Sequence, residues 1–356
     1  MQLMDEILEN TLIARLASGF PRSPLQRNRL HETDAELLAL PGSESLLALT
    51  TDWVVEEIES GLYGDPYLIG WMTVIVNASD LAAVGAEPLG ILINENLPRD
   101  AAPDFVSALQ DGIRDACAAA GLYVLGGDTN ISPRLAMGGT AVGLIRGIPP
   151  LTRIGCRPGD CVLGSGPFGS GSGFAFVQFV LRRRGIEVSF PFRPRPRLQE
   201  GQLLRRFATS CMDTSDGLLA TLDQLMRLNS VGFDIDCALE TMVEQATLAL
   251  SRSARIPAWL ALAAHHGEFE LVFTVPPERL DSLRGEAAAI DWEPRLLGRV
   301  VQQPRISLSL DQQTFALDMG LVRNLFVECG DDIDAYFKGL LQMDAALKEG
   351  DQRHDD

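Results

Sequence analysis

The chain has 356 residues, of which 46% are hydrophobic and 22% are charged, and it carries a formal net charge of −18. This length accommodates two domains of ordinary size, and the composition predicts a packed core rather than general disorder. The negative charge argues against nucleic acid and anionic membranes as partners, because no basic surplus is present to neutralise phosphates.

No apolar run reaches transmembrane length, and the first residues lack the basic and apolar regions of a secretory leader. Six cysteines occur without a Cys-x-x-Cys pair, which is typical of reduced thiols. These features predict a cytoplasmic protein without membrane contact. The four histidines are too few to suggest a zinc site or a histidine-driven triad; they are His31, His265, His266 and His354.

Hydrophobic periodicity predicts mixed helices and strands in the N-terminal half. A helix is expected over about residues 5–20, and a largely buried helix is expected within 65–86, beginning near Pro66. Asn77 and Asp80 lie inside the second helix, where they form either a structural polar network or an edge that faces a ligand. An amphipathic helix at 105–120 ends at Gly121. Strands are expected at 46–52, 89–93, 122–125 and 140–144.

The strand at 122–125 runs into Gly126-Gly127-Asp128-Thr129. The two glycines either form a plain turn or let the backbone approach a ligand closely.

The C-terminal half begins with a turn at Pro158-Gly159-Asp160 and a strand at 161–163. The glycine-rich segment 164–173 follows, but it lacks the Lys-Ser/Thr ending of a P-loop, so it is weak evidence for phosphate binding. Residues 182–199 are predicted to form an ordered loop. Further strands are expected at 232–236 and 269–275, and the polar tail beyond about 345 is expected to fray.

The stretch Asp213-Thr214-Ser215-Asp216-Gly217-Leu218 precedes a run with helical spacing. The two carboxylates, three residues apart, could share one face of the first turn, where backbone N–H groups are free. Carboxylates aimed at one point repel each other unless a cation lies between them, and Mg²⁺ suits such a site together with substrate phosphates. The alternative is a capping box in which Asp213 or Ser215 is the N-cap.

Five aspartates occur in similar sequence settings. Each lies next to glycine or threonine, or within an apolar segment. Such a set predicts an acidic centre for several divalent cations, which suits phosphoryl transfer. The five are Asp52, Asp80, Asp128, Asp213 and Asp216.

These pieces, in this order, resemble the thiamine-monophosphate kinases of the aminoimidazole-ribonucleotide (AIR) synthetase, or PurM-like, superfamily. The resemblance runs from about residue 30 to about residue 300. The matching stretches are Thr50-Thr51-Asp52, Ile69-Gly70-Trp71, Val76-Asn77-Ala78-Ser79-Asp80-Leu81-Ala82-Ala83-Val84-Gly85-Ala86, Gly126-Gly127-Asp128-Thr129, Leu151-Thr152-Arg153, Arg157-Pro158-Gly159-Asp160 and Asp213-Thr214-Ser215-Asp216-Gly217-Leu218.

The resemblance implies an α+β, two-domain architecture. Residues 1–150 would form an N-terminal α+β domain that binds ATP and Mg²⁺ and dimerises through its sheet. Residues 151–345 would form a C-terminal α/β domain, followed by a polar tail at 346–356. ATP would bind between the domains near the subunit interface, and its terminal phosphate would pass directly to thiamine monophosphate.

The resemblance also implies roles for individual residues. Asp213 and Asp216 would be catalytic, and ATP would be contacted by Gly127, Asp128, Arg153 and Ser215. The implied metal ligands are Asp34, Thr51, Asp52, Asp80, Asp128, Asp213 and Asp216.

Three departures from the family pattern lie mostly on the acceptor side. The family's early pair of acids is reduced to Asp34 within residues 32–36. A substrate-side histidine is replaced by Glu59, and a substrate-contacting glutamate by Gly267. His265 and His266 either replace lost contacts or form a helix end.

These departures leave the acceptor open. A kinase of the thiamine-monophosphate type is the leading hypothesis. An ATP-dependent ligase or cyclase and a non-catalytic nucleotide-binding relative are the alternatives.

Overall fold

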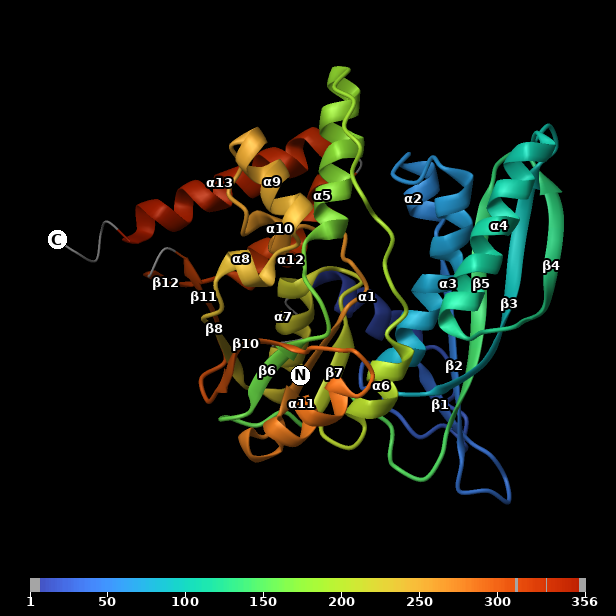
Figure 1. Cartoon of the computed structure of the whole chain (residues 1–356), viewed down its shortest axis with the longest axis horizontal. Coiled ribbons are helices and arrows are strands. Elements are labelled where there is room, and N and C mark those ends of the chain that lie inside the picture. The colour runs from blue at the N-terminus through green and yellow to red at the C-terminus, as the bar shows by residue number, and fades with distance from the viewer. Residues whose placement is uncertain (1–6, 311–312, 331, 352–356) are drawn as a thin grey trace.

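The computed structural model describes residues 7–310, 313–330 and 332–351. Two β-sheets lie in the two halves of the molecule, with helices packed around them (Figure 1). The predicted α+β, two-domain fold is confirmed at this level. None of the helices among the described residues is both long and apolar enough to cross a membrane.

The N-terminal sheet has five strands in the order β1-β2-β5-β3-β4. The strands are β1 (Glu36–Ala39), β2 (Leu46–Trp53), β3 (Glu87–Pro98), β4 (Val124–Ser132) and β5 (Ala136–Ile145). β3 and β4 pair in parallel, and the other neighbours are antiparallel. β4 therefore forms one open edge of the sheet.

Helices α3 (Pro66–Ala83) and α4 (Pro103–Ala120) pack against each other beside this sheet, and the short α2 (Val55–Glu59) precedes them. The two long helices approach closely because small residues lie at their contact. A Cβ atom at Gly70 would lie 2.0 Å from the Leu109 carbonyl oxygen, and one at Gly112 would lie 2.1 Å from that of Tyr67. α3 is buried along most of its length, which holds its last turn firmly against β2.

The C-terminal sheet has seven strands in the order β12-β11-β8-β10-β6-β9-β7. The strands are β6 (Cys161–Gly164), β7 (Ser210–Asp213), β8 (Gly232–Ile235), β9 (Leu271–Val275), β10 (Arg295–Val301), β11 (Ile306–Leu310) and β12 (Gln313–Ala316). Only the β8–β11 pair is parallel among the described strands of this sheet, so this half, expected to be α/β, is largely antiparallel.

Nine α-helices of four or more residues are described in this half. They are α5 (Ser170–Phe176), α6 (Leu198–Leu204), α7 (Leu218–Asn229), α8 (Leu239–Met242), α9 (Gln245–Ala254), α10 (Leu260–Ala263), α11 (Leu280–Ala288), α12 (Met319–Cys329) and α13 (Ile333–Asp351). The tail predicted to fray beyond 345 is helical as far as Asp351, and residues 352–356 lie outside the described part of the chain.

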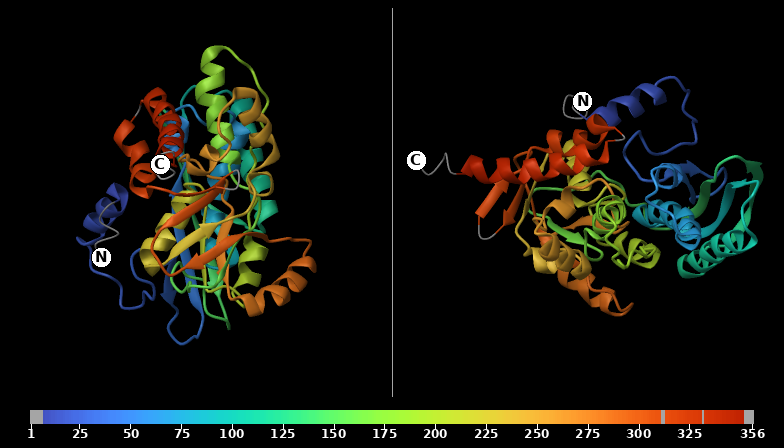
Figure 2. Two further views of the ribbon diagram at one scale, coloured as in Figure 1. Left: turned by 90° about the vertical axis from the view of Figure 1, so that its left-hand side faces the viewer. Right: turned by 90° about the horizontal axis from the view of Figure 1, so that it is seen from above.

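The first helix, α1 (Leu8–Ala17), lies against the C-terminal half rather than beside the N-terminal sheet (Figure 2). Asn10 Nδ2 donates to Gln224 Oε1 of α7 at 3.0 Å, and Arg323 of α12 pairs with Glu9 at 3.0 Å. The chain therefore crosses from one half to the other before β1.

The structure rules out two local alternatives that the sequence left open. The Gly126–Thr129 segment is not a turn but lies within β4 in extended conformation. Neither Asp213 nor Ser215 caps α7: the N-cap is Gly217, and it makes no side-chain capping bond. Asp213 ends β7, so it does not share a helical turn with Asp216.

Candidate active site

Three carboxylates from distant parts of the chain meet where the two halves face each other. Asp34 lies just before β1, Asp80 lies in the last turn of α3, and Asp213 ends β7. One carboxylate oxygen from each residue lies within 4.8 Å of one oxygen from each of the other two. A hard cation that prefers oxygen ligands fits such a group.

The hydrogen bonds around these acids leave room for a cation. Ser79 Oγ donates to Asp213 Oδ2 at 2.6 Å, and the Thr50 hydroxyl donates to Asp80. Arg153 Nη2 donates to Asp34 Oδ1 at 2.9 Å. The second oxygen of Asp34, Oδ2, is buried and has no hydrogen-bond partner among the described residues. A bound cation would satisfy that oxygen.

The pKa values reflect the crowding of negative charge. Burial raises the pKa of Asp213 to about 7, with Asp34 adding to the shift and the Ser79 hydroxyl opposing it. Burial, followed by the charges of Asp213 and Asp52, raises the pKa of Asp80 well above its usual value. Asp80 and Asp213 therefore resist ionisation unless positive charge arrives, which is the behaviour expected of a metal site.

Further acids extend the group toward the surface. Burial raises the pKa of Asp52 to about 6, and the Asp216 charge contributes. Burial likewise raises the pKa of Glu57 in α2 to about 7, with Glu56, Asp52 and Asp216 adding to it. Asp216 itself is 32% exposed. Asp52 and Asp216 thus belong to the same electrostatic cluster as Asp34, Asp80 and Asp213.

Asn77 and Asp80 serve the two roles that the sequence left open. The Asn77 side chain accepts from the Asp52 N–H at 3.1 Å and donates to the Thr73 carbonyl at 3.0 Å, so it fixes β2 against α3. Asp80, one turn later, is the residue that faces the acid cluster.

Thr51 does not present its hydroxyl to the cluster. Side chains alternate along a strand, and Thr50 is the neighbour that faces Asp80. The Thr51 hydroxyl instead donates to the Gly139 carbonyl at 2.9 Å and accepts from Thr140.

Gly127 and Asp128 also lie away from the cluster within one chain. Asp52, Gly139, Ile93 and Gly127 form one row across β2, β5, β3 and β4. Three strand spacings separate the ends of this row, about 14 Å. A Cβ atom at Gly127 would lie 1.8 Å from the Ile93 carbonyl oxygen, so glycine is required for the strand packing itself.

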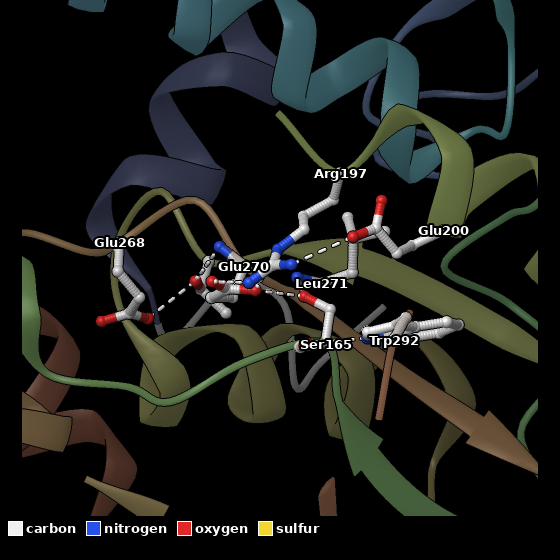
Figure 3. Close-up of polar contacts among 8 residues, drawn as sticks. Ser165, Arg197, Glu200, Glu268, Glu270, Leu271 and Trp292 are labelled. Carbon is white, nitrogen blue, oxygen red and sulfur yellow. Dashed lines mark hydrogen bonds and ion pairs between the residues drawn. The ribbon is translucent and has the colours of Figure 1, made fainter. Parts of the chain in front are cut away.

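The loop that connects Asp213 to Asp216 rests on a buried polar network, most of which is drawn in Figure 3. The Thr214 hydroxyl donates to Glu268 Oε1 at 2.7 Å and accepts from the Glu270 N–H at 3.0 Å. Glu270 accepts two bonds from Arg197, at 2.7 and 2.6 Å, and one from the Ser165 hydroxyl. This network fixes the backbone between the two aspartates.

The glycine-rich segment 164–173 contributes to the same support. The Gly169 N–H donates to Glu268 Oε2 at 2.6 Å, just before α5 begins at Ser170. That donor is therefore committed to a carboxylate rather than directed at a ligand.

Comparison with known proteins agrees with this geometry. Residues 32–145 match the family model of the AIR synthase related protein, N-terminal domain. The chain is 33% identical over 275 residues to the thiamine-monophosphate kinase of Escherichia coli (strain K12), which covers 75% of this chain and 82% of that protein. The chain belongs to the thiamine-monophosphate kinase family.

Solved structures show the same architecture. The thiamine-monophosphate kinase of Stenotrophomonas maltophilia K279a aligns with a TM-score of 0.65 at 28% identity, covering 84% of this chain and 96% of that one. The structure described as AaThiL complexed with AMPPCP and TMP aligns with a TM-score of 0.69 at 24% identity, covering 88% and 96%. At this identity, the second structure supports the shared fold and not the ligands of this chain.

Two acceptor-side positions differ from the thiamine-monophosphate kinase pattern, and the structure shows the surroundings of each, Glu59 and Gly267. Glu59 is half exposed and pairs with Arg134 at 2.9 Å. A Cβ atom at Gly267 would lie 1.6 Å from the Thr214 carbonyl oxygen, so this backbone excludes a glutamate there. His265 and His266 lie beyond α10 in an irregular segment beside Asp216 rather than at a simple helix end.

Sequence reasoning missed three residues of this kinase site. Glu57 follows β2 without any special spacing, and only the fold brings it near Asp52 and Asp216. Glu268 and Arg197 support Thr214 from positions 54 residues later and 17 residues earlier in the chain. The arginine-rich character of 182–199 was the one available signal, and it did not indicate a partner.

Proposed function

We propose that this protein is an ATP- and Mg²⁺-dependent kinase that transfers the terminal phosphoryl group of ATP to thiamine monophosphate, giving ADP and thiamine diphosphate. The observation that carries the proposal is the meeting of Asp34, Asp80 and Asp213 within 4.8 Å. The 33% identity to a thiamine-monophosphate kinase over most of both chains supports this choice of acceptor.

The residues present fit magnesium. Asp34, Asp80 and Asp213 would hold it at the centre, and Asp52 and Asp216 would extend the site outward. When bound, magnesium neutralises charge on the phosphates and on the group in transfer. The Thr51 hydroxyl is left out of the proposed ligand set because it faces the opposite side of the sheet.

Phosphoryl transfer depends mainly on positioning and electrostatics. Ser79 and Arg153 orient Asp213 and Asp34, and the Thr214 network holds the loop between Asp213 and Asp216. We assign Arg153 and Ser215 to ATP, since both lie next to the acid cluster. Asp213 and Asp216 then act by holding the reacting groups in line rather than by forming a covalent intermediate.

Gly127 and Asp128 are assigned to ATP as well, in a homodimer. β4 is an open edge strand that is exposed along almost its whole length. Its apolar side chains include Val124, Leu125 and Ile131, which are 52%, 57% and 56% exposed, and Tyr123 just before it is 75% exposed. An edge of this kind needs cover, and we propose that a second copy's N-terminal sheet supplies it.

The test is ADP formation with Mg·ATP, with and without thiamine monophosphate, together with detection of thiamine diphosphate. Acceptor-dependent ADP formation with matching thiamine diphosphate supports the kinase. ADP formation with phosphate released and no thiamine diphosphate indicates ligase or cyclase chemistry. Nucleotide binding without turnover indicates a non-catalytic relative, and either of these two results contradicts the proposal.

A further inference from the structure

The segment between α10 and β9 carries two adjacent histidines that face different walls of the site. His266 Nε2 lies 3.3 Å from the Tyr63 hydroxyl, between α2 and α3 of the N-terminal half. His265 Nε2 lies 3.8 Å from Asp216 Oδ1. The segment thus spans from the N-terminal half to the outer part of the acid cluster.

Two backbone features bring His265 and Asp216 together. The Gly267 N–H donates to the Ser215 carbonyl at 2.8 Å. A Cβ atom at Gly267 would collide with the Thr214 carbonyl oxygen at 1.6 Å, so only glycine lets the two loops run this close. The position of His265 is therefore coupled to the loop that carries Asp213 and Asp216.

The C-terminal helices hold the His265 side chain in place. Its ring stacks on Phe326 of α12, with centroids 4.5 Å apart and planes at 23°. Its backbone N–H donates to the Tyr336 hydroxyl of α13 at 2.7 Å, and Phe326 and Tyr336 pack edge to face at 5.4 Å. An imidazole fixed in this way loses little further freedom when a ligand binds.

The imidazole of His265 keeps donor capacity for a ligand. Its Nε2 lies 3.8 Å from Asp216 Oδ1, which is too far for a hydrogen bond, and the side chain is 29% exposed. By contrast, the His266 ring is engaged by Tyr63 and Phe192, and burial lowers its pKa to about 3. His265 is thus the member of the pair with donors available to a ligand.

Two arginines on this side already face carboxylates. Arg153, which is assigned to ATP, pairs with Asp34, and Arg134 pairs with Glu59. The Asp216 carboxylate would repel a phosphate group placed beside it, unless a hydrogen-bond donor also faced that phosphate.

We propose that His265 contacts the phosphate group of the acceptor and contributes to its selection, with Phe326 and Tyr336 as positioning residues. This inference rests on the proposed function. It implies that α12 and α13, which lie beyond the segment of sequence resemblance, help to form the part of the site that binds thiamine monophosphate. A hydrogen bond to a charged group is typically worth enough to change binding about tenfold.

The test is steady-state kinetics of the full chain carrying His265→Ala, His265→Gln or Tyr336→Phe, varying thiamine monophosphate and ATP separately. His265→Ala should raise KM for thiamine monophosphate about tenfold and leave KM for ATP within about twofold. His265→Gln, which keeps an N–H donor, should recover part of the loss. Tyr336→Phe, which removes only the hydroxyl, should give a smaller change of the same kind.

An unchanged KM for thiamine monophosphate in His265→Ala overturns the inference, and so does an equal rise for both substrates, because that pattern indicates a merely structural role. If the wild type forms no thiamine diphosphate, the proposed function fails separately. Calorimetric titration of inorganic phosphate into the Mg·AMPPCP-loaded protein then decides the inference: weaker binding in His265→Ala supports it, and equal binding overturns it.

Discussion

Asp213→Asn should stabilise the metal-free protein at neutral pH although it removes a proposed metal ligand. Asp213 is 2% exposed and has a pKa raised to about 7 from an ordinary 3.8. The folded protein therefore holds this proton more tightly than the unfolded chain does. The free energy of unfolding falls as pH rises from the unfolded pKa through the folded one, and it stays reduced above that range.

The size of the effect follows from the shift. Each pKa unit corresponds to about 1.4 kcal/mol, so this carboxylate costs the metal-free protein about 4 kcal/mol above pH 7. Asparagine has nearly the same shape and keeps an oxygen that can accept from Ser79. The asparagine side chain does not ionise, so the variant avoids the free-energy cost of a buried carboxylate at position 213.

Urea denaturation in EDTA measures the difference. Between pH 5 and pH 8, the stability advantage of Asp213→Asn over the wild type should grow by about 3 kcal/mol. Magnesium at pH 8 should then stabilise the wild type and not the variant. Asp104→Asn, at an exposed position in α4, serves as the control and should change neither result. A variant that is less stable than the wild type at pH 8, or a difference that does not depend on pH, would refute the reasoning.

Three other changes test separate parts of the account. Asp216→Asn should weaken Mg·ATP binding in calorimetry while the melting temperature stays unchanged; equal affinity for Mg·ATP would remove Asp216 from the site. Leu125→Lys, at an exposed position of β4, should convert a dimer into a monomer in light scattering, and a wild type that is already monomeric would contradict the proposed interface. Gly267→Ala should lower the free energy of unfolding by about 3 kcal/mol or more, because the methyl group would meet the Thr214 carbonyl; full stability in urea denaturation would contradict the close approach of the two loops.

Much of the fold could be predicted from local patterns. α4 has a regular apolar face and ends at Gly121, whose φ of 62° lies in the left-handed region that favours glycine. α3 is buried on most sides and begins at Pro66, with Asp65 as N-cap. Periodicity and end signals of this kind are properties of short segments, so they are visible without the tertiary structure.

The sequence left alternatives open where a local spacing is compatible with two structures. Gly126 and Gly127 are typical of a turn, yet close packing against β3 requires glycine in an extended strand. Asp213 and Ser215 before an apolar helical run are typical of a cap, yet Asp213 is bonded to Ser79 of α3 across the interface between the halves. That partner lies 134 residues away in the chain, and spacing around Asp213 carries no information about it.

The site itself was predictable only in part. Asp80 and Asp213 were named from their setting and from the family resemblance, and Asp34 from the resemblance alone; the structure brings these three together. Thr51 was named from the resemblance alone, and strand alternation turns its hydroxyl away from the cluster. Asp128 was named from its setting and from the resemblance, but three strand spacings separate it from the cluster within one chain. Glu57, Glu268 and Arg197 have no spacing signal, because their partners are brought to them only by the tertiary fold.

The most direct measurement of the central claim follows the fate of the terminal phosphate of ATP. The wild-type protein is incubated with γ-³²P-labelled ATP, Mg²⁺ and thiamine monophosphate, and the labelled products are separated. We predict that the label passes to thiamine diphosphate, and that EDTA abolishes the transfer. Label found in inorganic phosphate, with none in thiamine diphosphate, would contradict the account.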